Sequence, residues 1–313
     1  METKMTKLLG IKYPIIQGAM AWISEANLTA AVSNAGGAGV IATGGRTTEW
    51  VRDEIRKTKT LTSNPFGVNV MLMAPNKDEV VEVICEEKVA FVTLGAGNPV
   101  PFFEIFHKAG IKAIPVIPSV KLAKRVEAAG ADAIVIEGME AGGHIGTLTT
   151  MALLTNVIPE VSIPVIAAGG IVDGRGMAAA LLMGASGVQM GTRFLLSEEC
   201  TVHANAKQRI IAANDTDSVV TGYSRGHGVR GLKNTFTEKF LALEISGAPD
   251  EELNNLATGT NKLAAIDGDV ENGLVQAGQS LNRLNTIKPA KTFEDEIVAE
   301  AVQLLTNAAD LVK

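Results

Sequence analysis

The sequence lacks the features that mark several classes of protein. It has only two cysteines, Cys85 and Cys200, which lie far apart and without metal-site spacing, so reduced thiols are expected rather than a disulfide framework. No apolar run approaches the roughly 20 residues of a membrane-spanning helix, and Leu8-Leu9-Gly10 is too short for a secretion signal. A net charge of −6 gives no reason to expect nucleic acid or an anionic membrane as partner. We therefore expect a soluble, cytoplasmic protein.

Small and aliphatic residues are abundant instead. Hydrophobic residues make up 46% of the 313 residues and aromatic ones only 4%, while glycine occurs 32 times. Between residues 14 and 192, short apolar runs alternate with longer segments of helical spacing. Continuous apolar runs are typical of parallel strands buried on both faces. The predicted strands are residues 15–17, 39–41, 67–71, 90–93, 113–116, 133–136, 165–167 and 187–190.

Helices are predicted between these strands, at residues 28–34, 50–58, 78–87, 102–109, 120–129, 152–158 and 175–183. Gly110, Gly130 and Gly184 stand at or just beyond the ends of three of them, where glycine accepts the left-handed conformation that closes a helix. Eight strands with intervening helices predict an α/β fold, a (β/α)8 TIM barrel, and leave an open doubly wound sheet as the alternative.

The pattern of apolar and polar residues changes after the eighth predicted strand. Residues 200–285 are polar and helical in pattern, and we predict a helical insertion, a substrate-binding cap that overhangs the C-terminal face of the barrel. Residues 1–199 and 286–313 would form the barrel. An amphipathic helix at residues 293–311 would be its eighth helix.

Glycine-rich loops follow several of the predicted strands. Residues 167–171 and 189–194 come after strands seven and eight and precede helical stretches, an arrangement that commonly binds phosphate in barrels. The loop Gly18–Met20 after strand one would admit a flat ligand, or it is an ordinary turn. Asn69 on strand three faces a ligand or makes a structural hydrogen bond. No Gly-x-Gly-x-x-Gly fingerprint follows strand one, which counts against a Rossmann nucleotide site.

The most specific segment is Glu137–Gly146, which contains Glu140-Ala141-Gly142-Gly143-His144 after strand six. Histidine titrates near neutrality, so His144 at this position is predicted to transfer a proton during catalysis. No second histidine lies at metal-ligand spacing, so no metal is expected at Glu137, Glu140 or His144. No Gly-x-Ser-x-Gly elbow signals a serine nucleophile. Of the other histidines, His107 is predicted on an exposed helix and His203 at the surface or a helix cap; His227 is ambiguous.

These motifs together resemble the flavin-dependent enoyl-acyl-carrier-protein reductase II family, with nitronate monooxygenases as close relatives. The resemblance extends over nearly the whole chain. It rests on the Glu-Ala-Gly-Gly-His loop and on Tyr13–Gly18, Pro65–Asn69, Gly95–Pro99, Ala167–Ile171, Gly191–Phe194, Asp267–Asp269 and Ala277–Gln279. Nitronate monooxygenases typically have Gln and Arg where this chain has Glu137 and Ile145, so the resemblance favours the reductase.

The resemblance implies a bound FMN, NADH or NADPH as co-substrate, and an enoyl group carried by acyl-carrier protein, the last step of fatty-acid elongation. It also implies a homodimer, with His144 as the catalytic acid or base. The residues that would hold FMN are Gly18, Ala19, Met20, Asn69, Glu137, Gly142, Gly143, Gly169, Gly170, Gln189, Met190, Gly191 and Thr192.

Two alternative functions also agree with the sequence. One is a nitronate monooxygenase, in which His144 removes a proton from a nitroalkane and O₂ reoxidises the flavin. The other is a barrel that binds FMN without turnover. An acidic carrier protein would need a basic patch on this acidic chain, and we predict one at Arg225, His227, Arg230 and Lys233, unless this is an ordinary solvated loop.

Overall fold

The structure is a computed structural model that describes residues 1–312. In these residues one eight-stranded sheet has only parallel pairings between neighbouring strands. Its strands are β1 (Ile15–Gln17), β2 (Val40–Ala42), β3 (Gly67–Met71), β4 (Phe91–Gly95), β5 (Lys112–Ile117), β6 (Ile134–Glu137), β8 (Val165–Ala168) and β9 (Gly187–Met190).

The sheet closes on itself. Strand β1 pairs with β9 on one side. On the other side Ala38, just before β2, donates its N–H to Ile15 O at 2.9 Å and accepts from Gln17 N at 3.0 Å. The predicted TIM barrel is confirmed, and the open doubly wound alternative is wrong because an open sheet would leave β1 and β2 as unpaired edges or non-neighbours.

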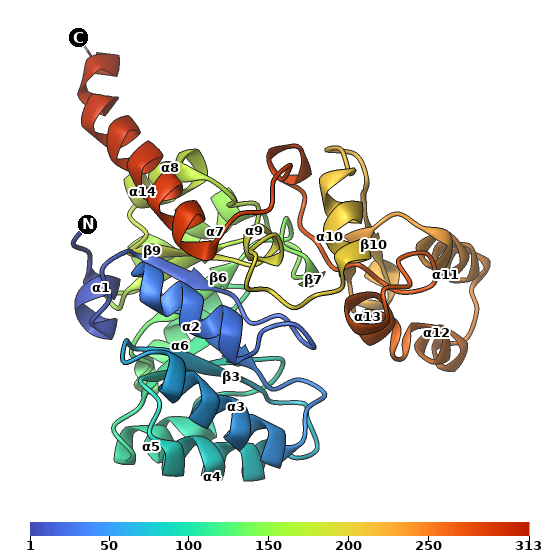
Figure 1. Cartoon of the computed structure of the whole chain (residues 1–313), viewed down its shortest axis with the longest axis horizontal. Helices are drawn as coiled ribbons and strands as arrows, with labels where there is room; N and C mark the ends of the chain where they lie inside the picture. Colours follow the sequence, from blue (N-terminus) through green and yellow to red (C-terminus); the bar gives the residue numbers. More distant parts are fainter. Residues whose placement is uncertain (313) are drawn as a thin grey trace.

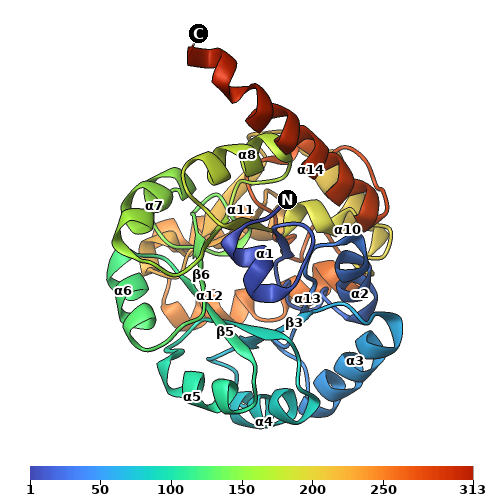
Figure 2. The same cartoon turned by 90° about the vertical axis from the view of Figure 1, so that its left-hand side faces the viewer.

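Helices surround the barrel in a ring (Figure 2). They cover the outer face of the strands with apolar side chains, as the continuous apolar strand pattern predicts. Seven of them lie within one residue or a few residues of the predicted ranges. The ring consists of α2 (Ala26–Ala35), α3 (Thr48–Leu61), α4 (Lys77–Glu87), α5 (Val100–Lys108), α6 (Val120–Ala128), α7 (Thr150–Val157), α8 (Gly174–Leu182) and α14 (Ala290–Asn307).

Residues 191–289 separate the last ring helix from its strand. Helix α14 packs against α8 and α2, and so fills the eighth position that the sequence pattern predicted for residues 293–311. Its final turns project beyond the barrel (Figure 1), and a 3₁₀ segment, η5 (Ala308–Val312), follows. Another 3₁₀ turn, η1 (Ile158–Glu160), extends α7.

A short N-terminal helix, α1 (Lys4–Leu9), was not predicted from the sequence. It lies across the N-terminal end of the barrel, at the centre of the ring in Figure 2. Its Met5 is fully buried and packs in one cluster with Ile16, Phe91 and Val135 from the strands. A helix of six residues is too short to give a clear periodic signal, which explains the omission.

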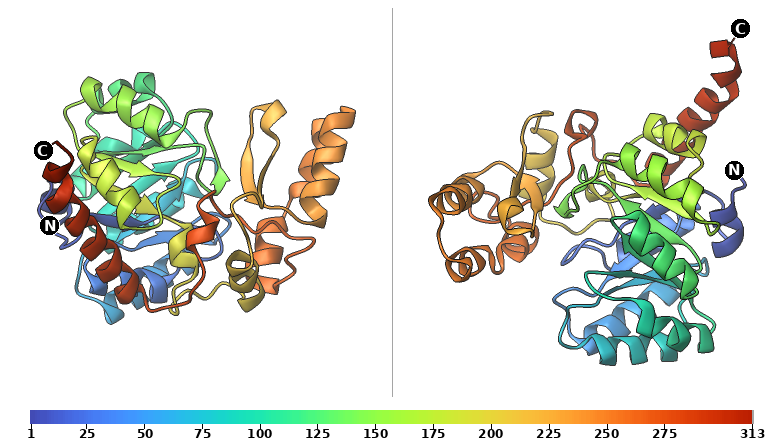
Figure 3. Two further views of the ribbon diagram at one scale, coloured as in Figure 1. Left: turned by 90° about the horizontal axis from the view of Figure 1, so that it is seen from above. Right: turned by 180° about the vertical axis from the view of Figure 1, so that it is seen from behind.

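Residues 200–285, which we call the cap, follow the one-turn helix α9 (Thr192–Leu195) and stand beside the barrel (Figure 3). Most elements of this predicted helical insertion are helices, and it also contains an antiparallel hairpin of β10 and β11, which was not predicted. The cap elements are α10 (Ala204–Ile211), β10 (Ser218–Thr221), η2 (Tyr223–Arg225), β11 (Val229–Leu232), α11 (Thr235–Ser246), α12 (Asp250–Ala257), α13 (Thr260–Lys262), the π-helical turn η3 (Leu263–Asp267) and η4 (Leu281–Arg283).

The cap has a small apolar core of its own, which includes Phe236, Phe240 and Leu253. It is tied to the barrel by β7 (Gly143–His144), which pairs antiparallel with β11. The hairpin escaped prediction because Thr221–Gly231 is rich in glycine and reads as a turn. Within residues 1–312 no helix is long and apolar enough to cross a membrane.

Candidate active site

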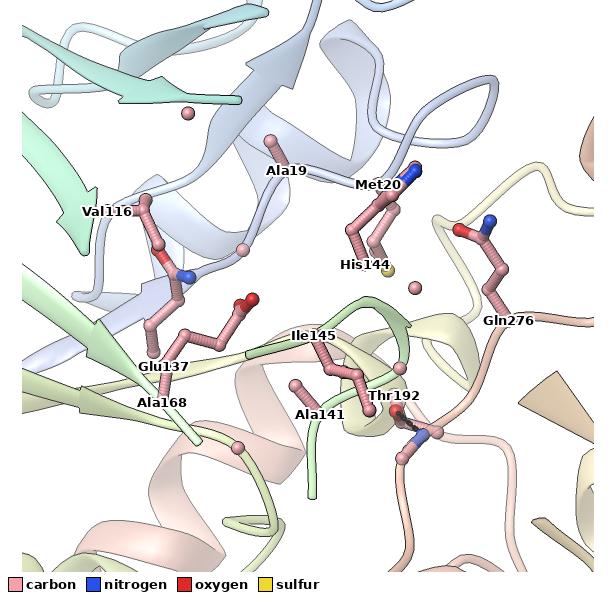
Figure 4. A pocket seen from close by; sticks show the side chains of 18 of the residues that line it. Ala19, Met20, Val116, Glu137, Ala141, His144, Ile145, Ala168, Thr192 and Gln276 are labelled. Atoms are coloured by element: carbon pink, nitrogen blue, oxygen red, sulfur yellow. Dashed lines mark hydrogen bonds between the residues drawn. The ribbon is translucent and has the colours of Figure 1, made fainter. Parts of the chain in front are cut away.

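A cavity of about 610 Å³ opens where the carboxyl ends of the barrel strands meet the cap. Its walls come from the loops after seven of the strands, from β7, from the hairpin and from the segment that returns from the cap (Figure 4). Ligand sites of barrel enzymes lie at this end, because the loops there can vary without disturbing the core. The volume is in the range of pockets that bind cofactors and small substrates.

The predicted site residues converge on this cavity. Those that line it are Gly18, Ala19, Met20, Asn69, Glu137, Gly142, Gly143, His144, Gly169, Gly170, Gln189, Gly191 and Thr192. Met190 is the exception, since its side chain is buried in the barrel core. The backbone of Met190 still shapes the site, because its carbonyl accepts a hydrogen bond from Gly18 N at 2.9 Å.

The loops after β8 and β9 form one wall with backbone rather than side chains. Gly169 and Gly170 both have positive φ angles, 98° and 72°, which favour glycine. The N–H groups of Gly169, Gly170, Gly191 and Thr192 find no acceptor on the backbone of residues 1–312. Donors of this kind at the start of short helices suit a phosphate group.

Close packing also keeps side chains out of the wall at Gly142. A Cβ atom there would lie 2.7 Å from the backbone carbon of Ala277, in the segment that returns from the cap. The same segment is fastened to the barrel loops: Gly278 N donates to Thr192 Oγ1 at 3.0 Å, and Gln279 N donates to Glu140 O at 3.0 Å (Figure 4 shows the first). The cavity therefore has a rigid, glycine-lined rim that a planar group can approach closely.

Polar side chains lie on the strands that form the base of the cavity. The Asn69 amide donates to Thr93 Oγ1 at 3.0 Å, so the structural hydrogen bond considered from the sequence exists, and Asn69 lines the cavity as well. Gln189 is nearly buried and packs against Gly18, where a Cβ would lie 3.2 Å from its Cγ. Together they offer amide groups to the edge of a flat heterocycle, so these residues fit a flavin ring and the glycine loops fit its phosphate.

Glu137 ends β6 and directs its carboxyl group into the cavity (Figure 4). Burial raises the pKa of Glu137 to about 7, because a carboxylate loses hydration there. A carboxyl group with this pKa is partly protonated at neutral pH. It can therefore donate a hydrogen bond as well as accept one.

His144 lies on β7, in the loop between β6 and α7, with its imidazole in the open part of the cavity. Its pKa is lowered, chiefly because burial disfavours the imidazolium and also because of the charge of His227. The loop is anchored from behind by Glu140, whose carboxylate accepts from Thr150 N at 2.9 Å at the start of α7. His144 is thus mostly neutral at pH 7 and can take a proton.

Several residues that line the cavity were not predicted as site residues from the sequence. They come mainly from β3, β5 and the cap: Met71, Met73, Thr93, Val116, Ile117, Pro118, Ile145, His227, Gln276, Gly278 and Ser280. The apolar ones look like ordinary core residues of strands, so only the closed barrel reveals that they face a ligand. His227 and Gln276 lie in loops. Gln276 directly precedes Ala277–Gln279, one of the motifs on which the family resemblance rests, and this motif was the signal that could have indicated Gln276.

The predicted basic patch lies only partly at the surface, because Arg225, His227 and Lys233 are exposed but Arg230 is buried. Arg230 is 4% exposed, and its guanidinium donates from Nε to Met139 O at 3.0 Å and from Nη1 to Ser218 Oγ at 3.0 Å. Arg225 pairs with Asp250 at 3.2 Å. The prediction is wrong for Arg230, because alternate residues of a strand face opposite sides and Arg230 faces the loop of His144 rather than solvent.

The predictions for the remaining histidines are confirmed. His107 lies on α5, partly exposed, at 2.8 Å from Asp132. His203 precedes α10 and accepts from Asn205 N at 3.1 Å as its cap. Among residues 1–312 no group of three or more His, Cys, Asp or Glu side chains could hold a metal ion.

Comparison with known families agrees with the resemblance inferred from the sequence motifs. The sequence profile of the nitronate monooxygenase family matches residues 2–82 and 74–300. The chain belongs to the nitronate monooxygenase family. A probable nitronate monooxygenase of Staphylococcus aureus is 36% identical, with 97% of this chain and 98% of that protein covered. The family and its named members are oxidoreductases, and this barrel is one of them.

Solved structures extend the comparison. FabK from Thermotoga maritima is 43% identical, has a TM-score of 0.97, and is matched over 99% of both chains. A nitroalkane oxidase from Streptomyces ansochromogenes is 29% identical with a TM-score of 0.87, over 98% of this chain and 100% of that one. A (3aS,4S,5R,7aS)-5-hydroxy-7a-methyl-1-oxo-octahydro-1H-indene-4-carboxyl-CoA dehydrogenase of Rhodococcus jostii is 33% identical over 97% of this chain and 96% of its own. The two solved structures share the fold of this chain, and the names of the nitroalkane oxidase and the carboxyl-CoA dehydrogenase refer to different substrates.

Proposed function

We propose that this chain is an FMN-dependent enoyl-acyl-carrier-protein reductase that uses NADH or NADPH to reduce a trans-2-enoyl thioester. The observation that carries the proposal is the likeness to FabK over 99% of both chains, at an identity higher than that of the nitroalkane oxidase, 43% against 29%. The Rhodococcus relative, named for a carboxyl-CoA substrate, supports thioester chemistry in this family. Glu137 and Ile145, which flank the His144 loop, agree with the reductase pattern.

The residues that line the cavity suit FMN. Its phosphate would be held by the N–H groups of Gly169, Gly170, Gly191 and Thr192, and its ring would lie towards the amides of the strands. FMN would supply hydride transfer, which no side chain can perform. The glycine loops bring backbone close to it, and the cap and its return segment limit the access of water.

His144 would act on the substrate rather than on the cofactor. Reduction at the β-carbon of an enoyl thioester places negative charge on the carbonyl oxygen, and a proton must reach the α-carbon. An imidazole nitrogen of His144 can donate a hydrogen bond to that oxygen in the neutral state. The imidazolium, whose pKa is lowered, releases its proton readily. Glu137, partly protonated at neutral pH, would donate to or accept from the bound ring.

Nitronate oxidation is the second candidate, and the lowered pKa of His144 favours it specifically. A mostly neutral imidazole is the form that removes a proton from a nitroalkane. The family profile and the 36% identical Staphylococcus aureus protein point the same way. Both candidates use the same cavity, the same FMN and the same histidine, so they differ in substrate rather than in architecture.

Acyl-carrier protein is proposed as the carrier of the enoyl group. With Arg230 buried and Arg225 paired with Asp250, the hairpin does not supply the four-residue basic patch that the sequence suggested. Lys233 remains exposed there. Charge reversal at Lys233 is expected to raise KM for carrier-protein substrate without changing KM for the matching CoA thioester, if the carrier docks on this side of the cap.

The half-reactions of the purified flavoprotein test the proposal under anaerobic conditions. NADH or NADPH should bleach the flavin, and a trans-2-enoyl thioester should then restore its absorbance with formation of one equivalent of saturated product. A flavin that a nitroalkane reduces and that an enoyl thioester cannot reoxidise would support the second candidate instead. A flavin that none of these compounds changes would indicate a binding protein.

A further inference from the structure

The catalytic loop and the cap share a small sheet, which places a second histidine beside the first. In the three-stranded sheet β10-β11-β7, His144 pairs with Val229 and Gly143 pairs with Arg230. Ile145 N also donates to Gly228 O at 3.0 Å. Residues 143–145 are therefore paired with the hairpin, and the position of the hairpin sets the position of His144.

His227 lies in the turn two residues before Val229, the first residue of β11 and the residue opposite His144. The hydrogen bond from Ile145 N to Gly228 O continues the pairing to Gly228, so His227 is the next residue beyond the paired segment. Both imidazoles line the cavity.

The turn before β11 holds His227 firmly. His227 N donates to Gly222 O at 3.1 Å. A Cβ on Gly222, whose φ is 71°, would lie 2.7 Å from His227 O. Residue 222 must therefore be glycine, and its backbone packs directly against the backbone of His227. Glu244 of α11 fixes the same turn from behind, accepting from Gly222 N and Ser224 N at 3.0 Å each. These contacts fix the backbone position of His227, although its side chain is exposed.

Few charges besides these two imidazoles face the cavity. Among the described residues that line it, the titratable ones are Glu137, His144 and His227. Behind the loop, Glu140 is held by the start of α7 and Arg230 by Met139 O. Positive charge on one imidazole therefore acts on the other with little competition, and the charge on His227 disfavours the imidazolium of His144.

We propose that His227 is a positioning residue of this active site: carried by the turn of the cap hairpin to the wall of the cavity that His144 also lines, it controls the charge state and orientation of the His144 imidazole. The cap thereby contributes to proton transfer as well as to substrate binding. This deepens the proposed function and rests on it only for the consequences in turnover. The effect on His144 itself does not depend on which substrate the enzyme takes.

The test is titration of the His144 ring protons by NMR in the intact flavoprotein, for the natural protein, His227→Gln and His227→Lys. His227→Gln removes the charge and should raise the pKa of His144, whereas His227→Lys makes the charge permanent and should lower it. The limb of the pH–rate profile that belongs to His144 should move in the same directions. The loss of kcat/KM at neutral pH should be smaller than the roughly 100-fold or greater loss of an acid–base group itself.

His107→Gln is the matched control, because His107 lies on α5, outside the cavity, and this variant should leave the His144 titration unchanged. Flavin absorbance checks that each variant is folded. A His144 titration that is identical in the natural protein, His227→Gln and His227→Lys would overturn the inference. If the titration shifts as expected but enoyl thioesters are not reduced, the inference stands and the proposed substrate fails.

Discussion

The two ends of the barrel are built on opposite plans. At the N-terminal end, α1 inserts Met5 among the strand residues Ile16 and Phe91, and no polar ligand could enter. At the C-terminal end, glycine loops replace side chains, and a cavity of about 610 Å³ remains with Glu137 and His144 in its wall. The difference teaches that this fold separates stability from chemistry: one end is filled to pack the core, and the other is left open for a ligand.

The largest expected effect comes from the open end. His144→Ala should lower kcat/KM for the enoyl thioester by about 10²–10⁴-fold, because it removes the group that we propose transfers the proton. The free energy of unfolding and the flavin content should change little, since the imidazole lies in the open cavity. Steady-state kinetics, flavin absorbance and denaturant unfolding measure the three quantities.

His107→Ala is the control for this variant, because it removes a partly exposed imidazole outside the cavity. It should leave turnover unchanged. If His144→Ala lost its flavin or its stability while the remaining holoenzyme kept normal turnover, His144 would be a structural residue and the division between the two ends would not hold.

The closed end should respond in the reverse way. Met5→Ala removes a fully buried side chain whose sulfur lies against Gly187, so it should reduce the free energy of unfolding by about 2–5 kcal/mol. Turnover per flavin should stay near normal. Met73→Ala makes the same substitution at the cavity rim, where the side chain is 74% exposed, and should cost less than about 0.5 kcal/mol. Equal losses in the two variants would contradict the comparison.

The strands and ring helices could be predicted because their signal is local. Parallel strands buried on both faces are continuous apolar runs, and glycine closes several helices, so eight strands and seven helices were located to within a few residues. Two elements could not be predicted: helix α1, which closes the N-terminal end of the barrel, and the β10–β11 hairpin of the cap. Met5 gains its meaning only from contacts with strands distant in sequence, and Val229 pairs with His144 across 85 residues of chain.

A buried carboxylate at the closed end gives a smaller effect that depends on pH. Glu294 of α14 accepts from Gly37 N at 2.8 Å, and burial raises its pKa to about 9 from its ordinary 4.5. Between these values the folded state keeps a proton that the unfolded chain has released, so stability falls as pH rises through this window.

Glu294→Gln should remove this dependence. The amide matches the shape of the protonated acid, so stability near about pH 5 should hardly change, whereas near about pH 8 the variant should gain roughly 1–3 kcal/mol. Unfolding curves across this range measure the slope. Parallel pH dependences of the two proteins would mean that Glu294 is ionised in the folded state and is stabilised by its neighbours.

The smallest effect concerns the contact between the cap and the open end. Lys262 of α13 lies 5.2 Å from the ring of Trp22, and Asn261 donates to Ala21 O at 3.4 Å. Lys262→Ala should cost about 0.5–1 kcal/mol and alter the emission of Trp22. Lys239→Ala, an exposed lysine on α11, should alter neither. Unchanged emission in Lys262→Ala would show that this contact does not hold the cap in solution.

Two parts of the candidate site could be predicted from the sequence: the glycine-rich loops and the loop that carries His144. Glycine loops and a histidine between glycines signal a ligand without knowledge of the fold. Residues such as Val116 and Ile145 line the cavity but have no distinctive chemistry, so only closure of the barrel assigns them. Arg230 was misplaced for the same reason, because the side to which a strand residue points depends on its partner strand.

The assignment of an enoyl reductase at the open end is tested most directly by one steady-state comparison on the purified flavoprotein. The account predicts that trans-2-enoyl thioesters drive oxidation of NADH or NADPH, with loss of this activity in His144→Ala. It also predicts that nitroalkanes drive no O₂ uptake when the pyridine nucleotide is omitted. Rapid O₂ uptake with a nitroalkane, together with no response to enoyl thioesters, would contradict it.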